Sequence, residues 1–157
     1  MINAFRILGY APDLSNFLVS DLSYQTLSFT KLEREFVILS FAQAFSSSYE
    51  WDQHIPISDA IGVSQEQRDA IERGDVDSEA FTVPQRVLMR FARAVAQSPR
   101  ASDELLAEFL TYYSHQQLIE ILILSGVYFL IARITTQLDV ELDEGAGVRL
   151  FRSDGGL

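Results

Sequence analysis

The chain has 157 residues, of which 48% are hydrophobic, so it is long and apolar enough to bury the core of one domain. Its formal net charge of -10 has the wrong sign for binding nucleic acid or an anionic membrane surface, and neither partner is expected. The absence of cysteine excludes a disulfide framework, a thiolate zinc site and thiol-based redox chemistry.

Helical patterns dominate the chain, and strand alternation is absent over any useful length. Four hydroxyl residues, each followed three positions later by Glu or Gln, have the spacing of helix-initiating capping boxes: Thr30, Ser64, Thr82 and Ser114. Ser102, followed by two acidic residues, indicates a fifth start, and Gly74 favours a helix end. The expected helices cover residues 2–9, 13–27, 31–46, 49–61, 65–73, 83–97, 103–112 and 115–138.

These elements predict an all-α, compact orthogonal domain of seven or eight helices over residues 1–143, followed by a flexible tail over 144–157. The four prolines, Pro12, Pro56, Pro84 and Pro99, are expected at helix starts or in loops and none in the middle of a helix. The N-terminal stretch "MINAFRILGYAPDLSN" lacks the basic start and long apolar core of a signal peptide, which favours a cytoplasmic protein.

The last predicted helix is apolar on nearly every face. Residues 118–134 contain Glu120 and Arg133, and the uncharged run between them is too short to span a bilayer. A helix without a polar face is either central to the domain or shared with another chain. We therefore expect a central, buried helix with one end in the interface of a homo-oligomer.

Glu35 is the first candidate site residue. In a helix that begins after Thr30, it lies beside the apolar stripe of Leu32, Phe36 and Leu39, so its carboxylate points at least partly inward. A buried carboxylate needs a partner. Arg34 and Arg133 are structural partners that the sequence alone leaves open.

His54 is the second candidate, near the middle of the following helix. Glu50 lies four residues before it on the same helix face, and a carboxylate beside an imidazole fixes its tautomer and suits it to proton transfer near neutral pH. His115 is the only other histidine, and no H-x-x-x-H pair occurs, so no metal site is predicted. The chain also lacks a G-x-S-x-G motif, a P-loop and a dinucleotide fingerprint, and no cofactor is expected.

The stretch "LEREFVILSFAQAFSSSYEWDQHIPISDAIGVSQEQ", continued by "PQRVLMRFARAV" and by the last helix, resembles the carboxymuconolactone decarboxylase family, which includes the alkyl hydroperoxidase D proteins. In the peroxidase branch, a glutamate is followed by Cys-x-x-Cys and then by a histidine. The resemblance places this glutamate on Glu35, the histidine on His54, and the two cysteines on Ser47 and Glu50. The relay histidine found between those cysteines in some members falls on Tyr49.

The resemblance implies an acid–base frame without redox sulfurs, so the chain is not expected to be a thiol peroxidase. It implies a cofactor-free lyase that decarboxylates a small conjugated carboxylic acid or lactone, with His54 and Glu35 moving protons and Tyr49 as an oxyanion donor. Alternatives are an isomerase or cyclase that tailors a polyketide-like or aromatic metabolite, and a ligand-binding or assembly protein without activity. The family resemblance also implies a dimer, trimer or hexamer.

Further residues are expected to contact the substrate: Ser47, Glu50, Trp51, Tyr128 and Arg133. For three of them a structural role stays open. Trp51 either walls the pocket or packs at a helix junction, and Tyr128 either lines the pocket or belongs to the core. Arg133 pairs either with a substrate carboxylate or with an acidic residue such as Glu35. Near the end of the last helix, Thr136 and Asp139 replace the Asn and Gly of the family's Asn-x-Leu-Gly, so no substrate contact is carried over there.

Overall fold

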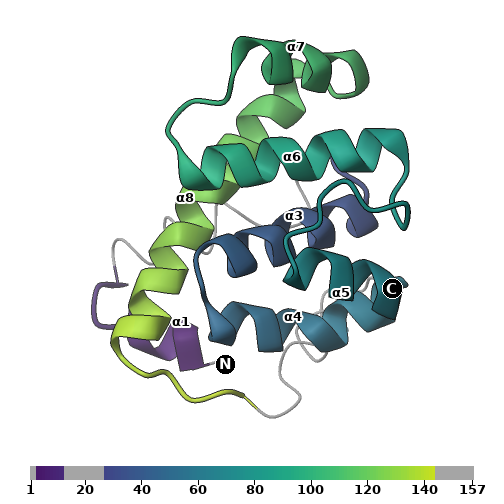
Figure 1. The fold of residues 1–157 in the computed structure, drawn as a ribbon. Helices are drawn as coiled ribbons and strands as arrows, with labels where there is room; N and C mark the ends of the chain where they lie inside the picture. Colours follow the sequence, from purple (N-terminus) through teal and green to yellow (C-terminus); the bar gives the residue numbers. More distant parts are fainter. Residues whose placement is uncertain (1–2, 13–26, 144–157) are drawn as a thin grey trace.

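The computed structural model describes residues 3–12 and 27–143, and within these residues it contains seven helices and no strand. The helices are α1 (Asn3–Leu8), α3 (Lys31–Ala44), α4 (Ser48–Ile61), α5 (Gln65–Glu72), α6 (Val83–Gln97), α7 (Asp103–Tyr112) and α8 (His115–Gln137) (Figure 1). The predicted all-α class is therefore confirmed, and seven of the predicted helices begin and end within two residues of the expected positions. The predicted helix over 13–27 and the tail over 144–157 lie outside the described residues, apart from residue 27.

The predicted helix starts are formed by the expected side chains. Thr30, Ser64, Thr82 and Ser114 each accept a hydrogen bond from the backbone N–H three residues on, and the Glu or Gln there bonds back to the cap. Ser102 caps α7 in the simpler way, by accepting from the Leu105 N–H. Each such cap stabilises its helix by about 1 kcal/mol.

Helix α3 is the centre of the domain. Every residue from Arg34 to Ala42 is buried, because α3 contacts α4, α5, α6 and α8 on different sides. Val37 and Phe41 pack in a cluster shared with α6, α7 and α8, whereas Phe36 and Leu39 pack in a second cluster shared with α5 and α6. A polar side chain anywhere in this segment is consequently inside the protein.

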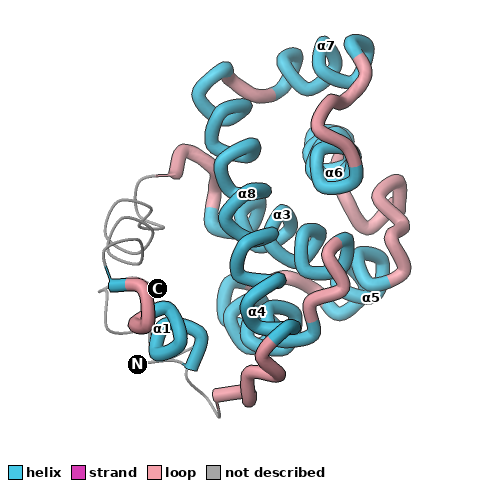
Figure 2. Tube along the Cα trace, turned by 90° about the vertical axis from the view of Figure 1, so that its left-hand side faces the viewer, coloured by secondary structure: helices cyan, strands magenta, loops and turns pink. Residues whose placement is uncertain are grey.

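Helix α8 is the longest helix and runs along one side of the domain, from α7 at one end to α1 at the other (Figures 1 and 2). The expectation that it is buried holds for one face only, which carries Ile121, Leu124, Tyr128, Ala132 and Thr135. The opposite face is exposed, and we call it the outer stripe: Ile119, Leu122, Ile123, Gly126, Phe129 and Leu130. By length and composition alone α8 also meets the requirements of a membrane-spanning helix, a test that core helices of soluble proteins pass as well.

Helix α1 stands at the lower end of α8, beside the segment that follows α8 (Figure 2). The Asn3 backbone N–H donates to Asp143 Oδ2 at 2.8 Å, and the Asn3 side chain donates to the Glu141 carbonyl at 3.0 Å. These contacts join two segments that lie about 140 residues apart in the sequence.

The expectation for Pro56 is wrong, because this proline lies in the interior of α4. Proline has no N–H, so the Asp52 carbonyl loses its usual helical partner. Helix α4 nevertheless continues to Ile61 and ends at Gly62, which has the left-handed backbone (φ 99°) that glycine adopts without strain.

Candidate active site

A buried hydrogen-bonded line joins three helices at the candidate site. Glu35 of α3 is fully buried, and its Oε2 lies 2.8 Å from Nδ1 of His54 on α4. On the other side of the ring, Nε2 of His54 lies 3.3 Å from the hydroxyl of Tyr128 on α8. His54 and Tyr128 are themselves 8% and 3% exposed, so the whole line is shielded from bulk water.

The direction of the hydrogen bonds in this line depends on which ring nitrogens of His54 carry protons. With its proton on Nδ1, neutral His54 donates to Glu35 and accepts from the Tyr128 hydroxyl at Nε2. When His54 takes up a second proton, it donates at both nitrogens, and the carboxylate of Glu35 stabilises the added charge. This is the arrangement that positions an imidazole to accept and return protons at Nε2.

The start of α4 contains two more buried polar groups, Ser47 and Glu50. Ser46 adopts a left-handed backbone (φ 56°), which ends α3 and places Ser47 as the N-cap of α4. Ser47 is 2% exposed, and its hydroxyl makes neither a capping bond nor any other hydrogen bond to the described residues. Because buried polar groups are normally paired, this hydroxyl is available to a ligand or water.

Glu50 follows one turn later and is 3% exposed. Its Oε1 accepts from the Thr135 hydroxyl of α8 at 3.2 Å, and its Oε2 has no hydrogen-bond partner among the described residues. Burial raises the pKa of Glu50 above its ordinary value of 4.5, and this effect exceeds the lowering by its own backbone N–H, by Thr135 and by the charge of His54. The spacing of Glu50 and His54 suggested a direct hydrogen bond, but His54 uses both ring nitrogens for Glu35 and Tyr128.

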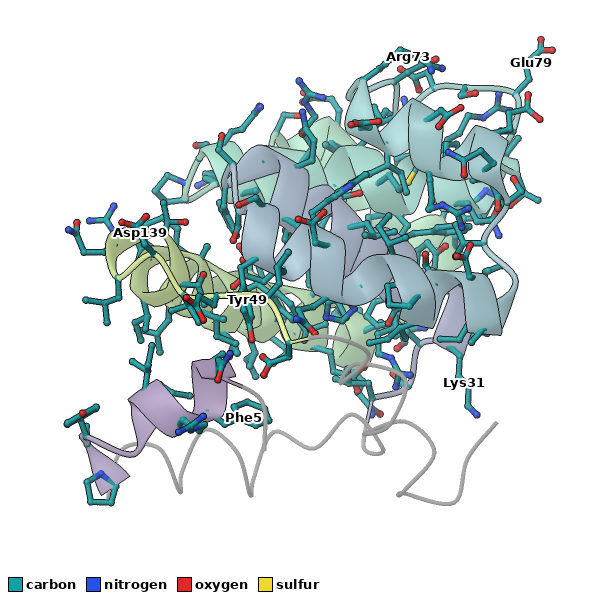
Figure 3. All side chains as sticks on the ribbon, turned by 90° about the horizontal axis from the view of Figure 1, so that it is seen from below. Phe5, Lys31, Tyr49, Arg73, Glu79 and Asp139 are labelled. Carbon is teal, nitrogen blue, oxygen red and sulfur yellow. The ribbon has the colours of Figure 1, made fainter. Side chains whose placement is uncertain are left out.

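The hydroxyl of Tyr49 is engaged away from this line. It donates to Asp143 Oδ2 at 2.7 Å and accepts from the Ala4 N–H at 3.3 Å, so it ties α4 to both α1 and the segment after α8 (Figure 3). Burial, together with the bond to Asp143, raises the pKa of Tyr49 above its usual range. The described contacts of Tyr49 are therefore structural, in contrast to the oxyanion role expected from the sequence.

Trp51 and Arg133 also lie outside the line. Trp51 packs against the cluster between α3 and α5, which is the helix-junction role left open by the sequence. Arg133 is exposed, and its guanidinium lies 5.2 Å from the centre of the Phe129 ring. The structural partner of Glu35 is His54, and neither arginine takes that place.

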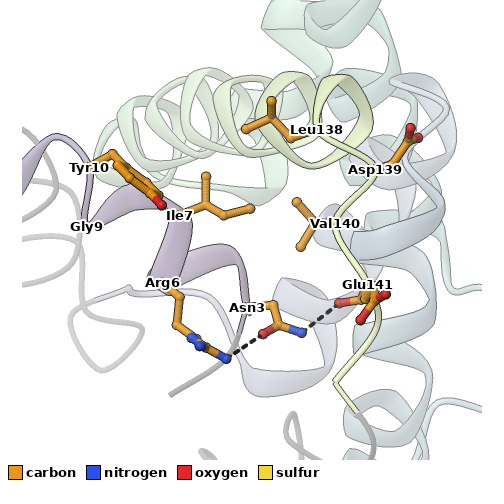
Figure 4. Close-up of a pocket in the computed structure, with 9 residues that line it drawn as sticks. All are labelled: Asn3, Arg6, Ile7, Gly9, Tyr10, Leu138, Asp139, Val140 and Glu141. Carbon is orange, nitrogen blue, oxygen red and sulfur yellow. Dashed lines mark hydrogen bonds between the residues drawn. The ribbon is translucent and has the colours of Figure 1, made fainter.

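Two open clefts flank the lower half of α8. One, of about 650 Å³, lies between α1 and the segment after α8 and is lined on one side by Arg6 and Tyr10 (Figure 4). The other, of about 910 Å³, lies at the end of α8 and is lined by Phe45, Phe129, Ala132 and Arg133 among others. Ala132 belongs to the same buried face of α8 as Tyr128 and Thr135, although neither of these two residues lines the cleft itself.

Within the described part of the chain, no group of three or more histidine, aspartate and glutamate side chains has an arrangement that could hold a metal ion. Thr135 was not identified from the sequence, because a threonine inside an apolar helix gives no signal of its own. Its position seven residues after Tyr128, on the same helix face, is the one feature that could have indicated it.

Comparisons with known proteins identify the fold. No family model and no curated protein matches the sequence. The debrominase Bmp8, solved as a Cys-to-Ala variant with 2,3,4-tribromopyrrole, is similar in structure, with a TM-score of 0.76 and 18% identity over 98% of this chain and 82% of that one. A protein of unknown function from Agrobacterium tumefaciens, described as a candidate antioxidant defence protein AhpD, is similar with a TM-score of 0.64 and 18% identity over 87% and 90% of the two chains. The protein thus has the carboxymuconolactone decarboxylase and alkyl hydroperoxidase D-like fold, which is the fold implied by the resemblance of its sequence.

Proposed function

We propose that this protein is a cofactor-free acid–base enzyme that decarboxylates a small conjugated carboxylic acid or lactone. The observation that supports the proposal is the buried line from Glu35 through His54 to Tyr128. A histidine held between a carboxylate and a phenol inside the protein is costly to bury and contributes little to packing. The same arrangement is what a histidine that transfers protons requires: a carboxylate that orients one ring nitrogen and a second nitrogen that faces another group.

The chemistry follows from what the substrate requires. When the bond to the carboxylate breaks, carbon dioxide leaves and its electron pair moves into the conjugated system, where negative charge collects on a carbonyl oxygen. His54 donates a proton at Nε2 to this intermediate, and Glu35 stabilises the imidazolium before the transfer. Tyr128 contacts the same nitrogen and holds it in place until the substrate arrives.

The cleft at the end of α8 is the proposed entrance for the substrate. Arg133 is the one cationic side chain among its lining residues, and Phe45 and Phe129 offer aromatic surfaces. Phe45 and Phe129 contact each other edge to face, with ring centres 5.3 Å apart. This combination suits a planar, unsaturated molecule that carries a carboxylate. Bmp8 was solved with a small brominated pyrrole, which gives independent support for a small ring as the ligand of this fold.

A lyase that uses this line does not need a thiol, whereas peroxidase chemistry of the Cys-x-x-Cys type does. The chain contains no cysteine, and Ser47 and Glu50 occupy the two positions that the resemblance assigns to sulfur. The same proton-transfer groups also suit an isomerase or cyclase acting on an aromatic or polyketide-like metabolite, which is the alternative within this proposal. The lack of cysteines suits a cytoplasmic enzyme.

An assembly role is the second candidate, and the outer stripe of α8 favours it. Exposed apolar patches of this kind mark protein contacts in soluble proteins. We propose that two or more copies of the chain associate through the stripe. The stripe lies opposite the face that carries Tyr128 and Thr135, but Phe129 belongs both to the stripe and to the lining of the proposed entrance, so the entrance adjoins the proposed interface.

The decisive experiment is incubation of the protein with a panel of unsaturated lactone carboxylic acids, followed by mass spectrometry for loss of carbon dioxide. His54→Ala is expected to lower kcat/KM for the accepted acid by about 10²- to 10⁴-fold. His115→Ala is the matched control, because His115 is exposed at the start of α8 and is expected to leave turnover unchanged. Unchanged turnover in the His54 variant, or no turnover of any acid by the wild type, would contradict the proposal.

A further inference from the structure

The carboxyl group of Glu50 has an environment that the proton line alone does not explain. It is 3% exposed, it lies one helical turn before His54, and one of its oxygens has no hydrogen-bond partner among the described residues. Ser47, three residues earlier, has a buried hydroxyl that is likewise without a partner. Two buried polar atoms without partners in the first turn of one helix are unusual, because such atoms are normally paired with protein, water or a ligand.

The contact with Thr135 satisfies the carboxyl group of Glu50 only in part. The Thr135 hydroxyl has a single proton and lies near three acceptors: the Ile131 carbonyl at 2.9 Å, Glu50 Oε1 at 3.2 Å and the Ala132 carbonyl at 3.4 Å. The hydroxyl donates to Glu50 Oε1 but is shared with two backbone carbonyls, and Glu50 Oε2 has no hydrogen-bond partner among the described residues. A buried carboxylate with one unpaired oxygen is costly, which favours the neutral acid.

The neighbouring groups oppose the effect of burial but do not outweigh it. Among the described residues, the charge of His54 and the hydrogen bond from the uncharged Thr135 of α8 both lower the pKa of Glu50, and Tyr49 is the other titratable group that interacts with it. Glu35 on α3 is occupied by His54. Burial is the largest influence on Glu50, and it raises the pKa of this carboxyl.

We propose that Glu50 is a catalytic residue of the same site: a neutral acid that delivers a proton to the carbon that loses the carboxylate. This inference rests on the proposed decarboxylase function. A conjugated anion carries its charge on an oxygen and on a carbon at different positions, so a group that stabilises the oxygen is not placed to protonate the carbon. Glu50 and His54, with Cβ atoms about 6 Å apart on one helix face, supply two such groups.

The proton balance of the step is simple. The bond between the carbon and its carboxylate breaks, carbon dioxide leaves, and the electron pair stays in the conjugated system with His54 donating to its oxygen. Glu50 then transfers its proton to the carbon and becomes a carboxylate, while the proton shared with the oxygen returns to His54. Glu50 regains a proton from solvent, so each turnover consumes one proton and releases one molecule of carbon dioxide.

The test uses the full-length protein in D2O with an unsaturated lactone carboxylic acid that the wild type decarboxylates. The wild type is expected to place deuterium on a single face of the product carbon. Glu50→Gln, which keeps the shape but carries no transferable proton, is expected to lower turnover by about 10²- to 10⁴-fold and to give deuterium on both faces, because solvent then protonates the carbon. Asp52→Asn makes the same chemical change at an exposed position of α4 and is expected to behave as the wild type.

The possible outcomes separate the two proposals. Loss of turnover in His54→Ala combined with wild-type turnover and stereochemistry in Glu50→Gln overturns the role of Glu50 and leaves the decarboxylase proposal standing. If the wild type accepts no acid of the panel, the decarboxylase proposal and the delivery step fail together. Infrared difference spectra of the wild type against Glu50→Gln test the neutral acid without a substrate. The carbonyl band of a protonated carboxyl is expected at pH values where an ordinary glutamate, with a pKa of 4.5, is ionised, and its absence overturns the neutral acid.

Discussion

His54 Nδ1 lies 2.8 Å from Glu35 Oε2, although the two residues are nineteen positions apart and belong to different helices. The contact exists because α3 is covered on all sides, so a carboxylate at position 35 meets no water and has to find its partner within the protein. Helix α4 packs against α3 and supplies that partner.

Replacing Glu35 by glutamine tests this relationship. Glutamine keeps the shape and a hydrogen bond to Nδ1 but removes the charge that stabilises the imidazolium. We expect kcat to fall by about 10²- to 10⁴-fold with little change in KM. We also expect a loss of about 1–3 kcal/mol in the free energy of unfolding, since the buried hydrogen bond to His54 loses its carboxylate acceptor. Turnover assays and denaturant titration measure the two effects, and Glu79→Gln at an exposed loop position is the control.

Replacing Tyr128 by phenylalanine separates the hydroxyl from the ring. The ring belongs to the main hydrophobic cluster and is expected to keep its place, so the free energy of unfolding should fall by only about 0.5–1.5 kcal/mol. The hydroxyl contact with His54 Nε2 is lost. If this contact positions the imidazole, NMR of the His54 ring is expected to show altered nitrogen shifts. Unaltered shifts would indicate that Glu35 alone holds the ring.

The sequence predicted the helices and their starts well, because a capping box is a local pattern whose physics acts within four residues. The assignment of Glu35 to the interior also followed from local spacing. Tyr128 and Thr135 could not be assigned in the same way. Which face of the apolar α8 meets α4 depends on long-range packing, and a helix that is apolar on all sides gives no periodic signal for that choice.

The contacts of Tyr49 could not be predicted from the sequence for a different reason. The resemblance placed it between the two former cysteine positions, but its hydroxyl turns toward Asp143 and Ala4. These partners come from two segments near opposite ends of the described chain. No spacing rule connects position 49 with position 143, so only the folded structure reveals the contact.

The pH dependence of stability is expected to report on Glu50. A pKa that is higher in the folded than in the unfolded protein means that the folded state binds the proton more tightly. The stabilising contribution is therefore complete below the unfolded-state value near 4.5 and is lost as the pH rises through the folded-state pKa. Denaturant titrations across this pH window measure how the free energy of unfolding falls as the pH rises. In Glu50→Gln, the part of this fall that comes from the titration of Glu50 is expected to be missing. Parallel curves for the wild type and the variant would show that Glu50 titrates normally.

Replacing Tyr49 by phenylalanine is expected to loosen α1. The change removes the donor to Asp143 and the acceptor for the Ala4 N–H, each worth about 1 kcal/mol. Hydrogen exchange of the amides of α1 is expected to accelerate, while amides of α3 keep their protection. Tyr10→Phe is the control, because Tyr10 is 94% exposed. If the exchange of α1 is unaffected, the contacts of Asn3 with Asp143 and Glu141 suffice to hold it.

The outer stripe of α8 is expected to join copies of the chain into an oligomer. Gly126 lies in the middle of the stripe, where a glycine costs about 1 kcal/mol relative to alanine, and a methyl group there would meet nothing within 4 Å in the isolated chain. A second helix that approaches closely at this point would give the glycine a packing role.

We expect the wild type to sediment as an oligomer and Ile123→Glu to sediment as a monomer with an unchanged helical spectrum. Val83→Glu, which adds the same charge at an exposed apolar position of α6, is expected to keep the oligomer. Helix α8 is also long and apolar enough to cross a membrane. A wild type that is monomeric and binds neutral lipid vesicles through the stripe would therefore show that this face contacts a membrane and not a second copy.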